Sequence, residues 1–71
     1  MIDTRKVKAR MILLGLTQPA VAEAMGINVA TFNQKINNKR RIYMDEYLKL
    51  CEILKLNTTE ERTELLGVAL I

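Results

Sequence analysis

The side chains best suited to bind another molecule are cationic, and they fall in two short stretches. Residues 35–41 carry four bases and no acid, a net charge of +4, and residues 1–10 carry four bases against one acid, a net charge of +3. Clustered bases of this kind are typical of a surface that binds an anion. Residues 42–71 carry three bases against six acids, so we expect that surface in the first 41 residues. The alternative is a solvated surface whose charge is merely uneven.

Groups that could carry catalysis or bind a metal are scarce. The sequence has no histidine and one cysteine, Cys51, which excludes a zinc site and an internal disulfide. No nucleophile–base pair, phosphate-binding loop or metal-ligand set is recognisable. We therefore expect no enzymatic activity, no metal, no cofactor and no small-molecule ligand. Cys51 falls in an apolar stripe, where we expect a core thiol rather than a reactive one.

Length and composition indicate one small domain over residues 1–71. The chain has 71 residues, 49% of them hydrophobic, with one proline and three glycines, a balance that favours helices over a turn-rich β design. No apolar stretch is long enough to span a membrane, and the N-terminus lacks the apolar core of a signal peptide. A single thiol suits a reducing compartment, so we expect a cytoplasmic protein.

Apolar spacing and capping residues predict five short helices. Two are expected over about residues 4–14 and 44–54, and a third begins near residue 58 with a capping box. The other two lie within residues 17–37, separated by Gly26. Four helices follow a residue whose side chain can cap them, namely Asp3, Thr17, Asn28 and Thr58. The expected core positions are Val7, Met11, Leu14, Val21, Ala22, Met25, Phe32, Ile36, Tyr47, Leu50, Cys51 and Leu54.

Residues 17–37 have the features of two short helices joined by a tight turn. Ala22 is small enough for two helix axes to approach closely, and Gly26 can adopt a positive φ without a Cβ clash. Apolar contacts between the two helices would come from Val21, Ile27 and Phe32. Such a pair is a helix-turn-helix, and its second helix can lie in the major groove of DNA, which admits one α-helix.

Five short motifs carry a resemblance to a known family. They are Gly15-Leu16-Thr17-Gln18, Val21-Ala22, Gly26-Ile27, Thr31-Phe32 and Lys35-Ile36-Asn37-Asn38-Lys39. Together they resemble the Cro and lambda-repressor (XRE) family of helix-turn-helix proteins over residues 5–56, and most closely its small regulators from phages and integrative elements. The resemblance implies an all-α, compact bundle of about five helices with the lambda-repressor-like DNA-binding fold. It also implies sequence-specific binding to double-stranded DNA by a transcriptional regulator, a repressor.

Three departures from the family pattern stand out. Lys35 occupies a position where many members carry an aliphatic residue, and we expect Ile36 to take that core role. Asn37-Asn38 replaces the usual Asn-Gly turn. The end of the second helix of the pair, the recognition helix, is therefore predicted only to within about one residue. Tyr43 stands where a serine or threonine would cap the next helix.

The resemblance implies two sets of DNA contacts. The base-contacting residues would be Val29, Ala30, Asn33 and Gln34. Amide side chains can bond adenine and small apolar ones can meet the thymine methyl, so the site would be rich in A·T contacts. The phosphate-contacting residues would be Gln18, Asn37, Asn38, Lys39, Arg40 and Arg41. Gln18 would also support the recognition helix.

Each of these roles has an alternative that the sequence leaves open. Asn33 and Gln34 could be solvated helix positions, and Asn28 fits a cap better than a base reader. The bases in residues 1–10 could follow a phosphate or a groove, or could only aid solubility.

We expect a homodimer on a palindromic operator, because one helix-turn-helix contacts only a few base pairs. Residues 58–71 hold the C-terminal helix and an apolar tail that either forms the dimer interface or completes the monomer core. The alternative function is a protein-interaction module, such as an antitoxin, whose acidic C-terminal third and tail bind a partner protein. Apart from these, we expect DNA as the partner and no membrane.

Overall fold

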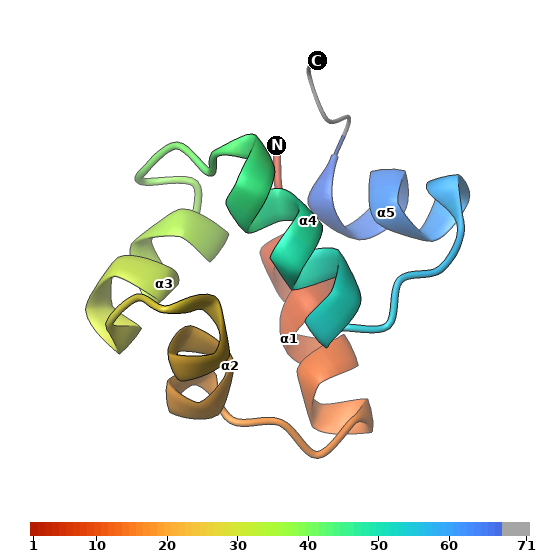
Figure 1. Ribbon diagram of the computed structural model, residues 1–71. Helices are drawn as coiled ribbons and strands as arrows, with labels where there is room; N and C mark the ends of the chain where they lie inside the picture. The colour runs from red at the N-terminus through yellow and green to blue at the C-terminus, as the bar shows by residue number, and fades with distance from the viewer. Residues whose placement is uncertain (68–71) are drawn as a thin grey trace.

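Five α-helices build the computed structural model, in which residues 1–67 are described and contain no β-strand (Figure 1). They are α1 (Thr4–Leu13), α2 (Gln18–Met25), α3 (Val29–Ile36), α4 (Met44–Ile53) and α5 (Thr59–Leu66). The expected all-α helix-turn-helix class is confirmed, with α2 and α3 as the helix pair. Two helices end one residue earlier than predicted, because Leu14 and Leu54 are the C-caps of α1 and α4.

The helices begin where side chains satisfy their first backbone N–H groups. The predicted caps Asp3, Thr17, Asn28 and Thr58 each accept a hydrogen bond from an N–H three residues later, at 2.8–3.3 Å. Asn28 is therefore a cap, as expected. Tyr43 precedes α4 without a side-chain cap, and the Glu46 carboxylate instead accepts its backbone N–H at 3.0 Å.

The helices are arranged so that α3 and α5 lie on opposite sides of the domain, with α1 and α4 between them (Figure 1). α2 packs against both α3 and α4, whereas α1 packs against α5. The outer side of α3 is thus left uncovered by the C-terminal helix. None of the helices in residues 1–67 is long and apolar enough to cross a membrane.

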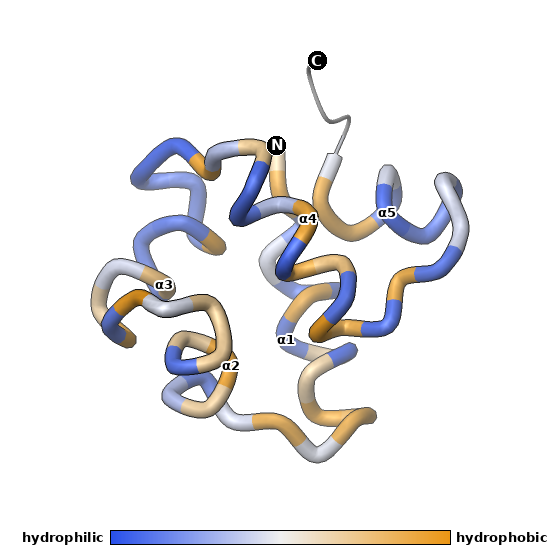
Figure 2. Tube along the Cα trace, in the orientation of Figure 1, coloured by the Kyte–Doolittle hydropathy of each residue, from blue (hydrophilic) through white to orange (hydrophobic). Residues whose placement is uncertain are grey.

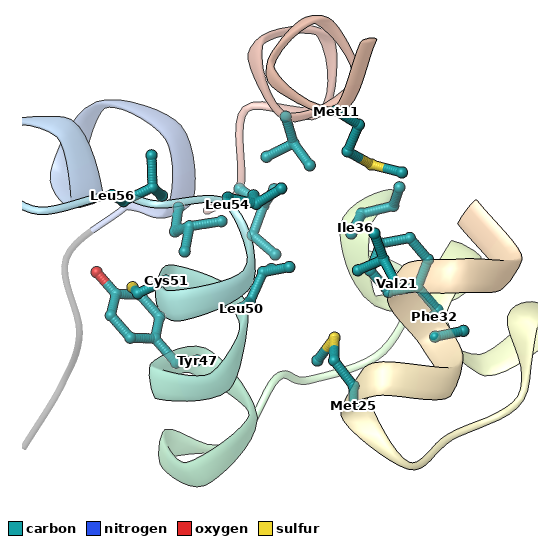
Figure 3. Close-up of a cluster of buried hydrophobic side chains, with 14 residues drawn as sticks. Met11, Val21, Met25, Phe32, Ile36, Tyr47, Leu50, Cys51, Leu54 and Leu56 are labelled. Atoms are coloured by element: carbon teal, nitrogen blue, oxygen red, sulfur yellow. The ribbon is translucent and has the colours of Figure 1, made fainter. Parts of the chain in front are cut away.

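The core lies where the helix-turn-helix meets α1 and α4. Phe32 and Ile36 of α3 face Leu50 and Leu54 of α4, with Val21 of α2 beside them (Figure 3). All predicted core residues are buried except Leu14, which is half-buried because it lies beyond the last turn of α1. Burial also raises the pKa of the Cys51 thiol, as expected of a core cysteine.

The C-terminal helix belongs to this core. Leu66 is only 3% exposed, Leu65 packs partly against the same cluster, and the Asp3 N–H donates to the Leu65 carbonyl at 2.8 Å. Leu65 and Leu66, the first of the apolar residues at the C-terminal end, therefore complete the monomer core. The predicted tail residues Val68–Ile71 lie outside the described part of the chain.

Candidate nucleic-acid interface

The outer face of α3 carries all four predicted base-contacting residues. Val29, Ala30, Asn33 and Gln34 are exposed, with Val29 at 43%, while Phe32 and Ile36 point into the core. Eight residues make α3 about 12 Å long, a length that fits in a major groove. The exposed face of α3 therefore carries both polar and apolar side chains, and no other helix within residues 1–67 covers it in Figure 1.

Amide side chains link α3 to the start of α2. The Asn33 amide donates to the Gln18 side-chain oxygen at 3.0 Å, and the Asn37 amide donates to the Asn33 carbonyl at 2.7 Å and to its side-chain oxygen at 3.2 Å. Both ends of the Asn33 amide are thus engaged within the protein. The Gln18 oxygen is occupied by Asn33, and among the described residues the Gln18 NH₂ group has no acceptor, so it is left as a donor. Within residues 1–67 the Gln34 side chain is exposed and makes no hydrogen bond.

The end of α3 explains the replacement of the family's Asn-Gly turn. Asn38 adopts a left-handed φ of 62°, and the Lys39 N–H donates back to the Gln34 carbonyl at 2.8 Å. Asn tolerates this conformation better than other non-glycine residues and here takes the glycine's place. Its side chain accepts from the Ile2 N–H and donates to the Ile2 carbonyl, both at 2.9 Å. The amide of Asn38 thereby ties the N-terminus to the end of α3.

Residues 37–43 connect α3 to α4 and hold the exposed cations. Lys39, Arg40 and Arg41 are exposed, and the Arg40 guanidinium donates to the Thr31 hydroxyl at 3.4 Å, beside the first turn of α3. Figure 2 shows the connection between α3 and α4 as hydrophilic over most of its length, with one hydrophobic segment before α4. We call residues 37–43 the basic loop. It places positive charge next to the outer face of α3.

Lys35 does not belong to the cationic surface that the sequence predicts for residues 35–41. It is 6% exposed, and its ammonium donates to the Glu46 carboxylate at 2.5 Å and to the Arg41 carbonyl at 3.2 Å. It also lies 5.1 Å from the centre of the Tyr43 ring. Burial disfavours the charged form of Glu46, but the bonds from Lys35 and Tyr43 outweigh it and lower the pKa of Glu46. The free charge of this stretch is therefore three cations rather than four.

A signal for the burial of Lys35 is present in the sequence. Lys35 lies three residues after Phe32 and directly before Ile36, within the stripe that faces the core. A buried lysine requires a partner of opposite charge, and Glu46 is the acid that α4 brings to it.

Some of the bases in residues 1–10 bond to other parts of the protein, and the others face the solvent. Lys6 pairs with Glu64 of α5 at 3.0 Å, and this contact raises the pKa of Lys6. Arg10 donates to the carbonyls of Leu54 and Lys55 at 2.8 and 2.9 Å, which satisfies the end of α4. Two of the four bases in residues 1–10 thus stabilise contacts between α1 and the C-terminal half.

No group of three His, Cys, Asp or Glu side chains within residues 1–67 is placed to hold a metal.

Comparison with known proteins agrees with this geometry. Residues 6–60 match the family described as the Cro/C1-type HTH DNA-binding domain. The matched range contains all of α2, α3, α4 and the basic loop, with most of α1 and the start of α5. No curated protein and no solved structure matched the chain.

Proposed function

Because the chain belongs to the Cro/C1-type helix-turn-helix DNA-binding family, we propose that it is a transcriptional repressor that binds a short operator through α3. The observation that carries this proposal is the pairing of an uncovered α3 face with the three exposed cations of the basic loop. Bases are read in the major groove, while cations beside the reading helix bind the phosphates that flank it. Repression would follow from steric exclusion of the polymerase at a promoter of a phage or integrative element.

The proposed base contacts come from the exposed residues of α3. Gln34 is the main reader in this proposal, since its free amide can bond adenine at two positions. Asn33 reads only if it exchanges its bonds to Gln18 and Asn37 for bonds to a base. Val29 and Ala30 meet thymine methyl groups, which favours A·T pairs in the operator.

The proposed phosphate contacts surround α3. Lys39, Arg40 and Arg41 supply charge from the basic loop, and the free NH₂ of Gln18 supplies a donor from the start of α2. Asn37 extends this set at the end of α3. The remaining predicted phosphate contact, Asn38, acts by holding the loop, because its amide is bonded to Ile2.

We propose that residues 1–71 work as one domain and bind a palindromic operator as a homodimer. Two copies related by a twofold axis would read half-sites about one helical turn apart. Because Leu65 and Leu66 complete the monomer core, the proposed interface is the rest of the apolar tail, Val68–Ile71.

Selection of bound sequences from a pool of random DNA duplexes tests the proposed function. We expect enrichment of a twofold-symmetric motif with A·T-rich half-sites. Sequencing of the retained duplexes against the starting pool measures the enrichment. A retained pool with the composition of the starting pool would exclude sequence-specific recognition, and an enriched motif without symmetry would exclude the palindromic dimer.

The Arg41→Ala variant should make duplex binding less dependent on salt. Each phosphate contact releases about one counterion, so the slope of log K against log salt should fall by roughly 1. The change should be the same on the selected duplex and on random duplex, because a phosphate contact carries no sequence information. Binding titrations at several salt concentrations measure it, with Lys6→Ala as the control, since Lys6 bonds Glu64 on the α5 side. A loss of affinity confined to the selected duplex would assign Arg41 to base reading.

A further inference from the structure

Lys35 and Glu46 form an ion pair in the interior, beneath the basic loop. Their side chains are 7% and 14% exposed, and the bond joins α3 to the first turn of α4. The pair also holds the loop at two points, because Lys35 donates to the Arg41 carbonyl at 3.2 Å and Glu46 accepts the Tyr43 N–H at 3.0 Å.

We propose that the Lys35–Glu46 pair positions the basic loop for phosphate binding. Lys35 and Glu46 are thus positioning residues for DNA binding, acting through the backbone of Arg41 and Tyr43. The inference rests on the proposed function. The other end of the loop is held separately, by the bonds between Asn38 and Ile2.

Stability alone is a poor explanation for a pair of this kind. Removing two charges from water costs about as much free energy as their attraction returns, and apolar residues of similar volume are often as stable or more so. Such residues would fill the space but could make no hydrogen bond to the loop backbone. The pair therefore supplies directed contacts at the Arg41 carbonyl and the Tyr43 amide, which packing cannot replace.

The double variant Lys35→Met/Glu46→Leu separates positioning from stability. It keeps the net charge of the chain and fills the same space with apolar side chains. We expect it to stay folded, with a melting temperature near that of the unaltered protein. The slope of log K against log salt on random duplex should fall by roughly 1 or more, because at least one phosphate is no longer bound by the displaced loop. The matched control is Lys6→Met/Glu64→Leu, which removes the exposed pair and should leave the slope unchanged.

Hydrogen exchange of the Tyr43 amide in the free protein provides a readout that does not depend on DNA. This amide donates to the Glu46 carboxylate, so its exchange reports whether the pair holds the end of the loop. We expect faster exchange in the Lys35→Met/Glu46→Leu variant and unchanged exchange in the control. If the unaltered protein bound no duplex, the proposed function would be wrong, and unchanged Tyr43 exchange would still overturn the positioning role by itself.

A folded double variant with the unaltered salt slope would also overturn the proposal, because the pair would then be structural only. Should the double variant not fold, the isosteric Glu46→Gln variant takes its place. It keeps an oxygen for the Tyr43 N–H but removes the charge that holds Lys35. We expect the slope of log K against log salt to decrease in this variant too, but by a smaller amount. An unaltered slope would again contradict the positioning role.

Discussion

The Phe32→Ala variant should lose about 3–5 kcal/mol of its free energy of unfolding. Phe32 is the sole phenylalanine of the chain and is fully buried on the inner side of α3, facing α2 and α4 (Figure 3). Truncation would open a cavity at the contact that sets the angle between the two helices of the motif. Because small domains are stable by only about 5–15 kcal/mol, much of the variant should be unfolded on mild heating. Urea or thermal unfolding followed by circular dichroism measures the loss.

Val29→Ala is the matched control in the same helix. Val29 is 43% exposed on the outer face, so its truncation removes little buried area and should change the unfolding midpoint only slightly. If the two variants were equally stable, the inner and outer faces of α3 would be assigned the wrong way round.

The single variant Glu46→Leu should cost about 3 kcal/mol of stability, in contrast to the double variant that removes both charges. It leaves the Lys35 ammonium buried with the Arg41 carbonyl and the Tyr43 ring as its remaining contacts. Removing one partner of a buried pair is costly because the other charge is left uncompensated. Denaturant unfolding of the single and double variants measures this difference directly.

The control for this prediction is Glu64→Leu. Its partner Lys6 is exposed and stays hydrated when the carboxylate is removed, so the change should be much smaller. Equal stability of Glu46→Leu and Glu64→Leu would contradict the buried, uncompensated charge.

Helix starts and the core faces are predictable from the sequence because their causes are local. Asp3, Thr17 and Asn28 each cap an N–H three residues away, so a short window of sequence contains both partners. Likewise, the inward direction of Phe32 and Ile36 follows from their spacing along one helix. The outer face of α3, and with it the candidate base contacts, is the complement of that stripe.

The contact between the start of the basic loop and the N-terminus is not predictable in this way, because it joins residues distant in sequence. Asn38 bonds Ile2 across 36 residues, and no local pattern relates the two. A count of charges alone misplaces Lys35, whereas its position on the inner side of α3 determines its exposure. The engagement of Asn33 by Gln18 equally requires the packing of α2 against α3.

The central claim, that α3 reads base edges, is tested most directly by Gln34→Ala on matched duplexes. Affinities of the unaltered protein and the variant are measured on the selected duplex, on the same duplex with one A·T pair replaced, and on random duplex. We expect the variant to bind the selected duplex more weakly by roughly 1–3 kcal/mol, and random duplex by much less. Replacing the one base pair that Gln34 contacts should lower the affinity of the variant far less than it lowers the affinity of the unaltered protein. Equal losses of affinity on all three duplexes would contradict base reading by α3.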